Sequence, residues 1–134
     1  MDDYRAIALP ATQRAVEVFR ERAERRVPLI HYAKGSAHLH GLIRTLDIDA
    51  VSLDWRDDLR ANRTAHGDRF AFQGNLDPSR MHGSPEAATA AAQRVLDEAG
   101  DAPGHVFNLG HGFAPGAKID CVEAVLRLIT GDSS

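Results

Sequence analysis

Short runs of apolar residues alternate along the chain with longer stretches of helical character. The short runs are almost unbroken, which is typical of strands buried on both faces of a parallel sheet. They cover residues 27–33, 49–55, 69–74 and 105–109. Helices are expected over residues 3–25, 37–46, 57–65, 85–99 and 120–130. The pattern therefore predicts one helix followed by four strand–helix units, with Pro10 splitting or kinking the first helix.

Polar and glycine residues mark the expected helix ends. Ser84 is a good N-cap, and Gly100 is a good residue to end the helix that follows. Asp120 followed by Glu123 resembles a capping box, and Gly131 is expected to end the last helix.

Repeated strand–helix units imply parallel strands joined by right-handed crossovers, so we expect an α/β fold. No linker, low-complexity stretch or sequence repeat interrupts the chain, and residues 1–134 are expected to form one domain. A closed eight-stranded barrel takes about 250 residues. Four strands in barrel curvature would leave two open edges, which favour association unless they are covered. The sheet should therefore flatten, pair with another half, or be part of a larger barrel.

The charge balance argues against nucleic-acid binding. The net charge is -3, whereas a nucleic-acid footprint needs clustered surplus Lys and Arg. One run of arginines, residues 20–26, is interrupted by glutamates and falls near a predicted helix end. We interpret it as a solvated face that complements the helix dipole.

Cys121 is the only cysteine, so the chain cannot form an internal disulfide, and a reducing compartment is expected. Within the last predicted helix it is expected to be a small core residue. Asp2 and Asp3 do not suit a signal peptide, and no apolar run approaches the length of a membrane span. We therefore expect a soluble, cytoplasmic protein without membrane contact.

Polar residues beside glycine or a turn former follow each predicted strand. These stretches are residues 31–35, 53–55, 73–78 and 108–112. In parallel α/β folds, functional groups gather where strands end and the next loops begin. The four stretches are therefore expected to share one mouth.

The same four segments, in order, resemble the end of the uroporphyrinogen decarboxylase family. They read "YAKGSAHL", "AVSLDW", "FAFQGNLDP" and "HVFNLGHGFAPG". The leading segment "DDYRAIALPATQRAV" is similar to the family helix that precedes them, so the resemblance covers essentially the whole chain. It implies the carboxy-terminal half of a (β/α)8 barrel.

The resemblance also implies a reaction. The family removes the carboxyl groups of the four acetate side chains of uroporphyrinogen, giving coproporphyrinogen in porphyrin and heme biosynthesis, without metal or organic cofactor. A protonated pyrrole must act as the electron sink, so a carboxylate is needed to stabilise the developing cation. Arginines are needed to hold the peripheral carboxylates, and other groups to hand over protons.

His111 in "NLGHG" matches the family's active-site histidine near the carboxy terminus. Histidine suits this task because small environmental changes move its charge across neutral pH, so it can bind a substrate carboxylate or relay a proton. The glycines on both sides would allow a close approach of backbone and substrate. The resemblance thus assigns His111 as the catalytic and substrate-binding residue.

The family's other signature groups lie in its amino-terminal part and have no counterpart here. They are an arginine-rich loop, a catalytic aspartate, a tyrosine and a serine. The chain alone is therefore not expected to be a competent decarboxylase. It would depend on a complementary amino-terminal half-barrel, or on a homodimer that closes a barrel from two copies.

Other residues at the expected mouth were weighed as substitutes. Asp54 and Asp77 are carboxylates at strand ends, and Lys34 could bind a substrate carboxylate. In the family these positions look structural, and Asp77 before Pro78 suits a turn or cap. Trp55 is interpreted as a packing residue under the loops.

Two other functions remain open. Corrinoid-linked methyltransferases on the same barrel bind zinc through a His-x-Cys pair and a later Cys. Here the position two residues after His31 is Ala33 instead of Cys, and His111 takes the later position. No metal site is expected, although a His31–His111 pair stays open, while His38 and His40 face different directions on a helix. The other alternative is a non-catalytic, vestigial domain that self-associates through its edges.

Overall fold

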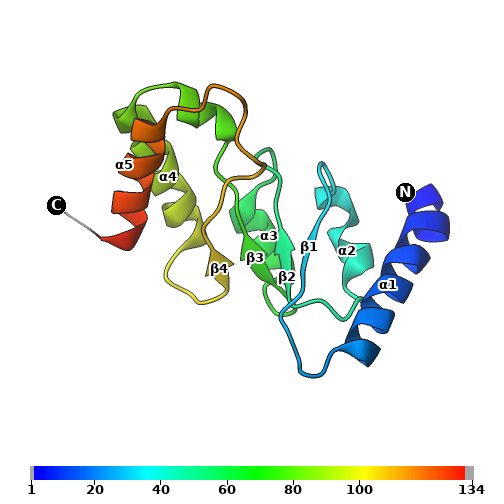
Figure 1. The fold of residues 1–134 in the computed structure, drawn as a ribbon. Helices are drawn as coiled ribbons and strands as arrows, with labels where there is room; N and C mark the ends of the chain where they lie inside the picture. Colours follow the sequence, from blue (N-terminus) through cyan, green and yellow to red (C-terminus); the bar gives the residue numbers. More distant parts are fainter. Residues whose placement is uncertain (1, 132–134) are drawn as a thin grey trace.

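Four short parallel strands form one sheet in the computed structural model, which describes residues 2–131 (Figure 1). They are β1 (Ile30–Tyr32), β2 (Ala50–Ser52), β3 (Ala71–Gln73) and β4 (His105–Val106), and their order in the sheet is β1-β2-β3-β4. The register pairs His31 with Val51, and Val51 with Phe72. A parallel bridge between Leu76 and Leu109 continues the contact of β3 and β4 beyond their ends.

Helical segments connect the strands in the predicted alternation. They are the π-helix η1 (Tyr4–Ala8), α1 (Leu9–Arg22), the 3-10 helix η2 (Ala37–Leu39), α2 (His40–Ile43), α3 (Leu59–His66), the 3-10 helix η3 (Pro78–His82), α4 (Pro85–Ala99) and α5 (Ile119–Thr130). In Figure 1, α1 and α5 lie at opposite ends of the row of elements. The predicted α/β fold, one helix followed by four parallel strand–helix units, is confirmed.

One face of the sheet packs on the helices, and the other is open. Val51 and Phe72 are fully buried and belong to a core shared with α3, α4 and α5. Side chains alternate between the faces of a strand, so their neighbours point the other way. On the open face, the side chains of Ile30, Tyr32 and Val106 are between 41% and 49% exposed. In a barrel built from such units, the face without helices would form the inner wall.

The strands are shorter than predicted: a side-chain hydrogen bond precedes β1, and a glycine with positive φ follows β3. The backbone N–H of Leu29 donates to the carboxylate of Asp49 (2.8 Å), not to a neighbouring strand. At the other end of the sheet, β3 stops at Gln73, and Gly74 adopts a positive φ of 127°. That conformation favours glycine, which explains the glycine directly after this strand.

The first helix is interrupted where the sequence predicts it. Pro10 lies in the first turn of α1, and the wider π-helical turn of η1 directly precedes it. Proline has no N–H to donate to the preceding turn. The helix then ends at Arg22, three residues earlier than predicted.

Three of the four expected helix ends are confirmed. The Ser84 hydroxyl accepts a hydrogen bond from the Ala87 N–H (3.3 Å), while Gly100 and Gly131 end α4 and α5 with positive φ. The capping box at Asp120 was wrong: Lys118 is the N-cap residue of α5. Asp120 lies inside the first turn, where its carboxylate still favours the positive end of the helix dipole.

The predicted solvated face holds for the exposed Arg22, Arg25 and Arg26, but the interpretation was wrong for Arg20 at the end of α1. Arg20 is only 14% exposed and contacts Asp49 (2.7 Å) and Asp47 (3.0 Å). Arg26 reaches the same Asp49 (2.7 Å). Hydrogen bonds from Arg26, from the Leu29 N–H and from Arg20 hold the pKa of Asp49 well below its usual value. The network ties the end of α1 to the start of β2.

The helix predicted over residues 37–46 is reduced to η2 and the short α2. As predicted, its two histidines face different directions: His38 is exposed, whereas His40 is fully buried. His40 Nδ1 lies 2.6 Å from the Asn62 side-chain oxygen on α3, and Ser36 Oγ lies 3.4 Å from its other ring nitrogen. His40 is thus a polar link between α2 and α3.

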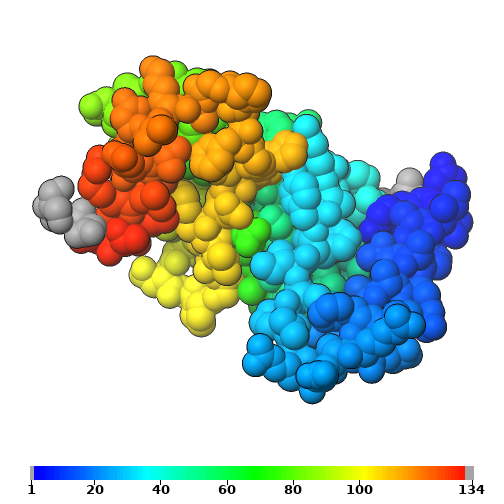
Figure 2. Space-filling model, in the orientation of Figure 1, coloured from blue at the N-terminus to red at the C-terminus, as the bar shows by residue number. Residues whose placement is uncertain are grey.

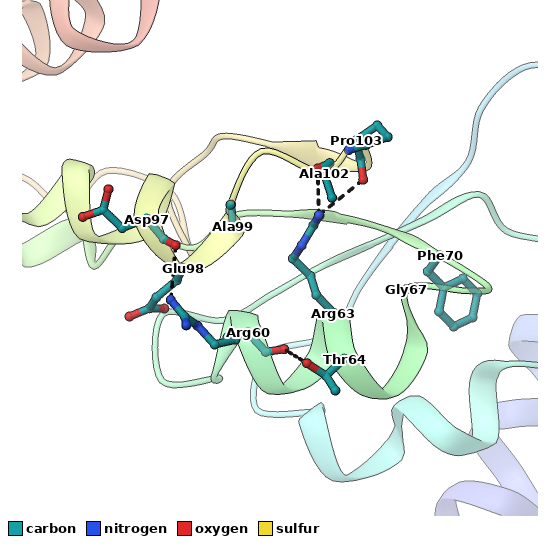
Figure 3. A pocket seen from close by; sticks show the side chains of 11 residues that line it. Arg60, Arg63, Thr64, Gly67, Phe70, Asp97, Glu98, Ala99, Ala102 and Pro103 are labelled. Atoms are coloured by element: carbon teal, nitrogen blue, oxygen red, sulfur yellow. Dashed lines mark hydrogen bonds between the residues drawn. The ribbon is translucent and has the colours of Figure 1, made fainter.

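A hollow of about 490 Å³ lies at the amino ends of β3 and β4, between α3 and the end of α4 (Figure 3). Arg63 donates to the carbonyls of Ala102 (2.8 Å) and Pro103 (3.3 Å), and Arg60 to that of Asp97 (3.2 Å). In barrels this end serves stability, because the strands present their functional loops at the opposite end.

None of the described helices is long and apolar enough to cross a bilayer.

Candidate functional site

A hollow of about 420 Å³ opens on the free face of the sheet, toward the carboxyl ends of the strands. It is lined by side chains from three strands and by the loop after β4: Ile30, Tyr32, Ser52, Gln73, Asn108, Leu109, Gly110, His111 and Gly112. In Figure 2 the orange segment after β4 meets the cyan segment at the end of β1, and below this contact the green of β3 is visible between the yellow and the cyan. The predicted common mouth of the strand ends is present.

His111 stands at this mouth, exposed to solvent and flanked by two aromatic rings. Its imidazole is nearly parallel to the indole of Trp55, with 6.0 Å between ring centroids and 9° between planes. The phenol ring of Tyr32 lies at 6.1 Å, tilted by 35°. The imidazole is therefore oriented by packing on both rings while its polar edge remains accessible.

Gly110 fixes the path of the His111 loop. A side chain at this position would overlap Trp55, because its Cβ would lie 2.7 Å from the Trp55 Cα and 2.8 Å from its Cβ. The Tyr32 hydroxyl also donates to the Gly110 carbonyl (3.2 Å). Gly110 thus permits a close approach to the Trp55 backbone, whereas a Cβ at Gly112 would meet nothing within 4 Å, and the approach of substrate expected at both glycines stays a prediction.

Asp54 is a buried structural carboxylate, in agreement with the role expected for it. Arg56 donates to both of its oxygens, from Nε (3.0 Å) and from Nη2 (2.7 Å). The Gly35 N–H donates to the same carboxylate (3.2 Å). Arg56 is the main reason that the pKa of Asp54 is lowered. Asp54 thereby joins the loop after β1 to the loop after β2.

The same loop after β2 contains a second carboxylate, Asp57, whose pKa is shifted in the opposite direction. Burial raises the pKa of Asp57, whose oxygen accepts from the Asp54 N–H (3.2 Å). The side-chain amide of Asn75 donates to the carbonyls of both Asp54 (3.0 Å) and Asp57 (2.7 Å). The "QGNLDP" motif therefore holds the loop that contains the "LDW" motif through hydrogen bonds from the Asn75 side chain.

Asp77 is a cap, as its position before a proline predicted. It precedes η3, and its side chain accepts from the Ser79 N–H (2.9 Å). Asp77 does not line the hollow that holds His111. Its contribution is to the start of the 3-10 helix after β3.

Trp55 combines packing with contacts to cations. Lys34 Nζ lies 5.0 Å from the indole centroid, and Arg56 Cζ lies 4.9 Å from it. The predicted packing role is incomplete, because the ring stacks on His111 and also holds two charged groups. Sequence reasoning missed two residues, Tyr32 and Arg56. Arg56 pairs with Asp54, two positions earlier in the chain. The alternation of side chains along residues 30–32 was the available signal for Tyr32.

His31 does not join His111. Both neighbours of His31 on β1 line the hollow, so its own side chain lies on the helix-covered face of the sheet. Its Nδ1 is buried without a hydrogen-bond partner, and burial together with the nearby His40 lowers its pKa. Within residues 2–131, no three His, Cys, Asp or Glu side chains are grouped so as to hold a metal ion.

Comparison with known proteins decides the family. The family model described as uroporphyrinogen decarboxylase (URO-D) matches residues 1–131. The chain belongs to the uroporphyrinogen decarboxylase family. Its α/β architecture accordingly forms part of a TIM barrel.

Named relatives agree with this placement. The chain is 48% identical to the uroporphyrinogen decarboxylase of Azoarcus sp. over 112 residues, which are 83% of this chain and 31% of the relative. It is 40% identical to that of Coxiella burnetii over 127 residues, covering 94% and 35%. It is 37% identical to that of Chloroflexus aurantiacus over 128 residues, covering 95% and 36%. The chain spans about a third of the length of these uroporphyrinogen decarboxylases.

Proposed function

We propose that this chain supplies one wall of a uroporphyrinogen decarboxylase active site, with His111 in contact with the substrate. The observation that carries the proposal is the position of His111: exposed at the mouth of the strand ends and oriented by Trp55 and Tyr32. The reaction is the decarboxylation of the acetate side chains of uroporphyrinogen to give coproporphyrinogen. His111 would hydrogen-bond a substrate carboxylate or pass on a proton.

The chemistry also calls for a carboxylate next to the pyrrole, and this wall does not supply one. Among the described residues that line the hollow, none is Asp or Glu. Asp54, the carboxylate just after β2, is buried and held by Arg56. A cation that develops on the substrate would therefore need its counter-charge from elsewhere. This supports an inactive chain that gains activity with a complementary amino-terminal part.

The surface at the β4 end of the sheet fits such a partner. Val106 on β4 is 48% exposed, and Phe113 in the following loop is 58% exposed. Beside them Leu126 and Ile129 of α5 are 50% and 37% exposed and border an apolar groove of about 160 Å³. A next strand and helix of a barrel would pair with the edge and cover this groove.

The runner-up is a non-catalytic domain that associates with itself. The same open edges favour it, because two copies of the chain could cover each other's apolar surfaces. In a barrel closed by two copies, each would present its His111 at the mouth. Sedimentation of the purified chain over a concentration series separates a monomer from such a dimer.

The decisive experiment is complementation. The chain is mixed with the separately expressed remainder of the Azoarcus relative, and release of coproporphyrinogen from uroporphyrinogen is measured. We expect activity in the mixture and none with either part alone. His111→Ala should abolish it, whereas His38→Ala, which alters an exposed histidine on η2, should retain it. A complex that forms without activity would favour the vestigial domain, and full activity in His111→Ala would refute the assigned role.

A further inference from the structure

The indole of Trp55 is the point where three basic side chains meet. His111 stacks on it, Arg56 Cζ lies 4.9 Å from its centroid, and Lys34 Nζ lies at 5.0 Å. An ammonium over an aromatic face is attracted by the electron-rich ring, which restricts the motion of a side chain that is otherwise flexible. Lys34 is thus held beside the mouth.

The two cations on Trp55 differ in what they have left to bind. Arg56 is committed to Asp54, to which it donates from Nε and Nη2. For Lys34, by contrast, residues 2–131 provide no hydrogen bond or ion pair to the ammonium group. The indole supplies attraction but accepts no strong hydrogen bond, so the three N–H donors of Lys34 remain available.

The backbone around Lys34 is also fixed. Lys34 follows β1 after one residue, and the next residue, Gly35, turns the chain with a φ of 71°. The Gly35 N–H is anchored on Asp54, the same carboxylate that holds Arg56. A buried carboxylate therefore positions both the loop of Lys34 and its neighbouring cation. The lysine is placed by the fold and not by chance contact at a loop tip.

We propose that Lys34 is a substrate-binding residue that receives a peripheral carboxylate of the tetrapyrrole while His111 faces another part of the same molecule. The inference rests on the proposed function. No Lys or Arg is among the described residues that line the hollow, and the charge of the nearby Arg56 is paired with Asp54, so Lys34 supplies the available cation beside the mouth. The ammonium group of a lysine held over an aromatic ring acts as a point charge, and it lacks the fixed bidentate geometry of the arginine guanidinium. It therefore suits carboxylates that shift as successive acetates are lost.

The chain contains two lysines, which permits a direct test. Lys34 and Lys118 are dimethylated with a ¹³C label, a change that keeps their charge, and the complete chain is titrated with coproporphyrin while their NMR signals are followed. We expect the Lys34 signal to shift in a saturable manner and that of Lys118, which donates to the Gly83 carbonyl, to stay in place. A porphyrin that carries cationic substituents in place of carboxylates should move neither.

Substitutions of the two lysines measure how much each contributes to coproporphyrin binding. Lys34→Gln should weaken coproporphyrin binding by about threefold to fivefold, the scale of one exposed ion pair. Lys34→Arg should recover most of this loss, and Lys118→Gln should bind as the unmodified chain. A Lys34 signal that does not respond to coproporphyrin, or unchanged binding by Lys34→Gln, would overturn the proposal.

The complemented enzyme separates this inference from the proposed function. There, Lys34→Gln should raise KM for uroporphyrinogen by about threefold to fivefold and leave kcat within about twofold, because a peripheral contact contributes to binding more than to the chemical step. If the complemented Lys34→Gln enzyme is active with an unchanged KM, only the proposed role of Lys34 is refuted. A carboxylate-dependent shift of Lys34 in a chain that never complements would refute the decarboxylase function and leave the binding residue standing.

Discussion

Gly110 and Trp55 touch backbone to backbone, and a Cβ on Gly110 would lie 2.7 Å from the Trp55 Cα. This contact joins the loop that carries His111 to the loop after β2. It also accounts for one glycine of the "NLGHG" motif by packing alone. The glycine on the other side of His111 has open space around its α-carbon.

The first prediction follows from this difference. Gly110→Ala should lower the free energy of unfolding by about 1–3 kcal/mol, because rigid backbone and not a flexible side chain occupies the space. Gly112→Ala, the matched control, should change it by less than about 0.5 kcal/mol. Urea denaturation followed by circular dichroism measures both. Equal losses in the two variants would contradict the packing argument.

The Tyr32 hydroxyl gives the second prediction. Tyr32→Phe removes the hydrogen bond to the Gly110 carbonyl and should cost about 0.5–1.5 kcal/mol of stability, toward the lower value because Tyr32 is 41% exposed. Amide exchange in residues 108–112 should accelerate. Tyr4→Phe, the change at the other tyrosine, should leave exchange in that loop unaltered. If the loop exchanges equally fast in both variants, the hydroxyl does not hold it.

The third prediction concerns the ion pair beneath the mouth. Arg56→Gln leaves the buried Asp54 carboxylate without its main partner and should lower the urea midpoint, though less than for a fully buried pair because Arg56 is 58% exposed. Asp54→Asn combined with Arg56→Gln should cost less than the two single losses added together. Strict additivity in this double-mutant cycle would show that the pair does not couple.

The fourth prediction is a loss of stability in mild acid. Burial lowers the pKa of His31, whereas an unfolded histidine titrates near about 6.5. The unfolded chain then binds more protons below that pH, so stability is fully present above about pH 6.5 and falls as the pH drops toward the lowered folded pKa. The lowered pKa values of His66 and His105 act in the same direction.

His31→Leu should make the pH dependence of the urea midpoint less steep, because it removes a half-buried titrating group whose buried Nδ1 has no hydrogen-bond partner. The exposed His38, changed to Gln, is the control and should leave the slope as it is. A slope that persists unchanged in His31→Leu would assign the acid sensitivity to the other histidines.

The sequence allowed the order of elements to be predicted because periodicity and glycine positions are local properties. Ser84 and Gly100 could be recognised as helix ends, since a cap depends on residues within one turn. The capping box at Asp120 failed because Lys118 already has the extended backbone that precedes α5. Two acidic residues at the right spacing do not decide where a helix starts when the preceding loop fixes its path.

The site was predictable in outline only. The "NLGHG" motif led to His111, and the strand ends led to the mouth, because parallel strands bring their carboxyl ends together. The contacts of Arg20 with Asp47 and Asp49 were not predictable, since they depend on how α1 docks beside the sheet. The stacking of Trp55 on His111 likewise depends on two loops that are more than 50 residues apart in the sequence.

The stacking of Trp55 on His111 has an optical consequence. Trp55 is the only tryptophan in the chain, so nearly all of its indole emission originates at the mouth of the candidate site. A tetrapyrrole that absorbs in the emission range of the indole would alter that signal directly. The chain thus carries an intrinsic fluorophore at the place where its function is proposed to reside.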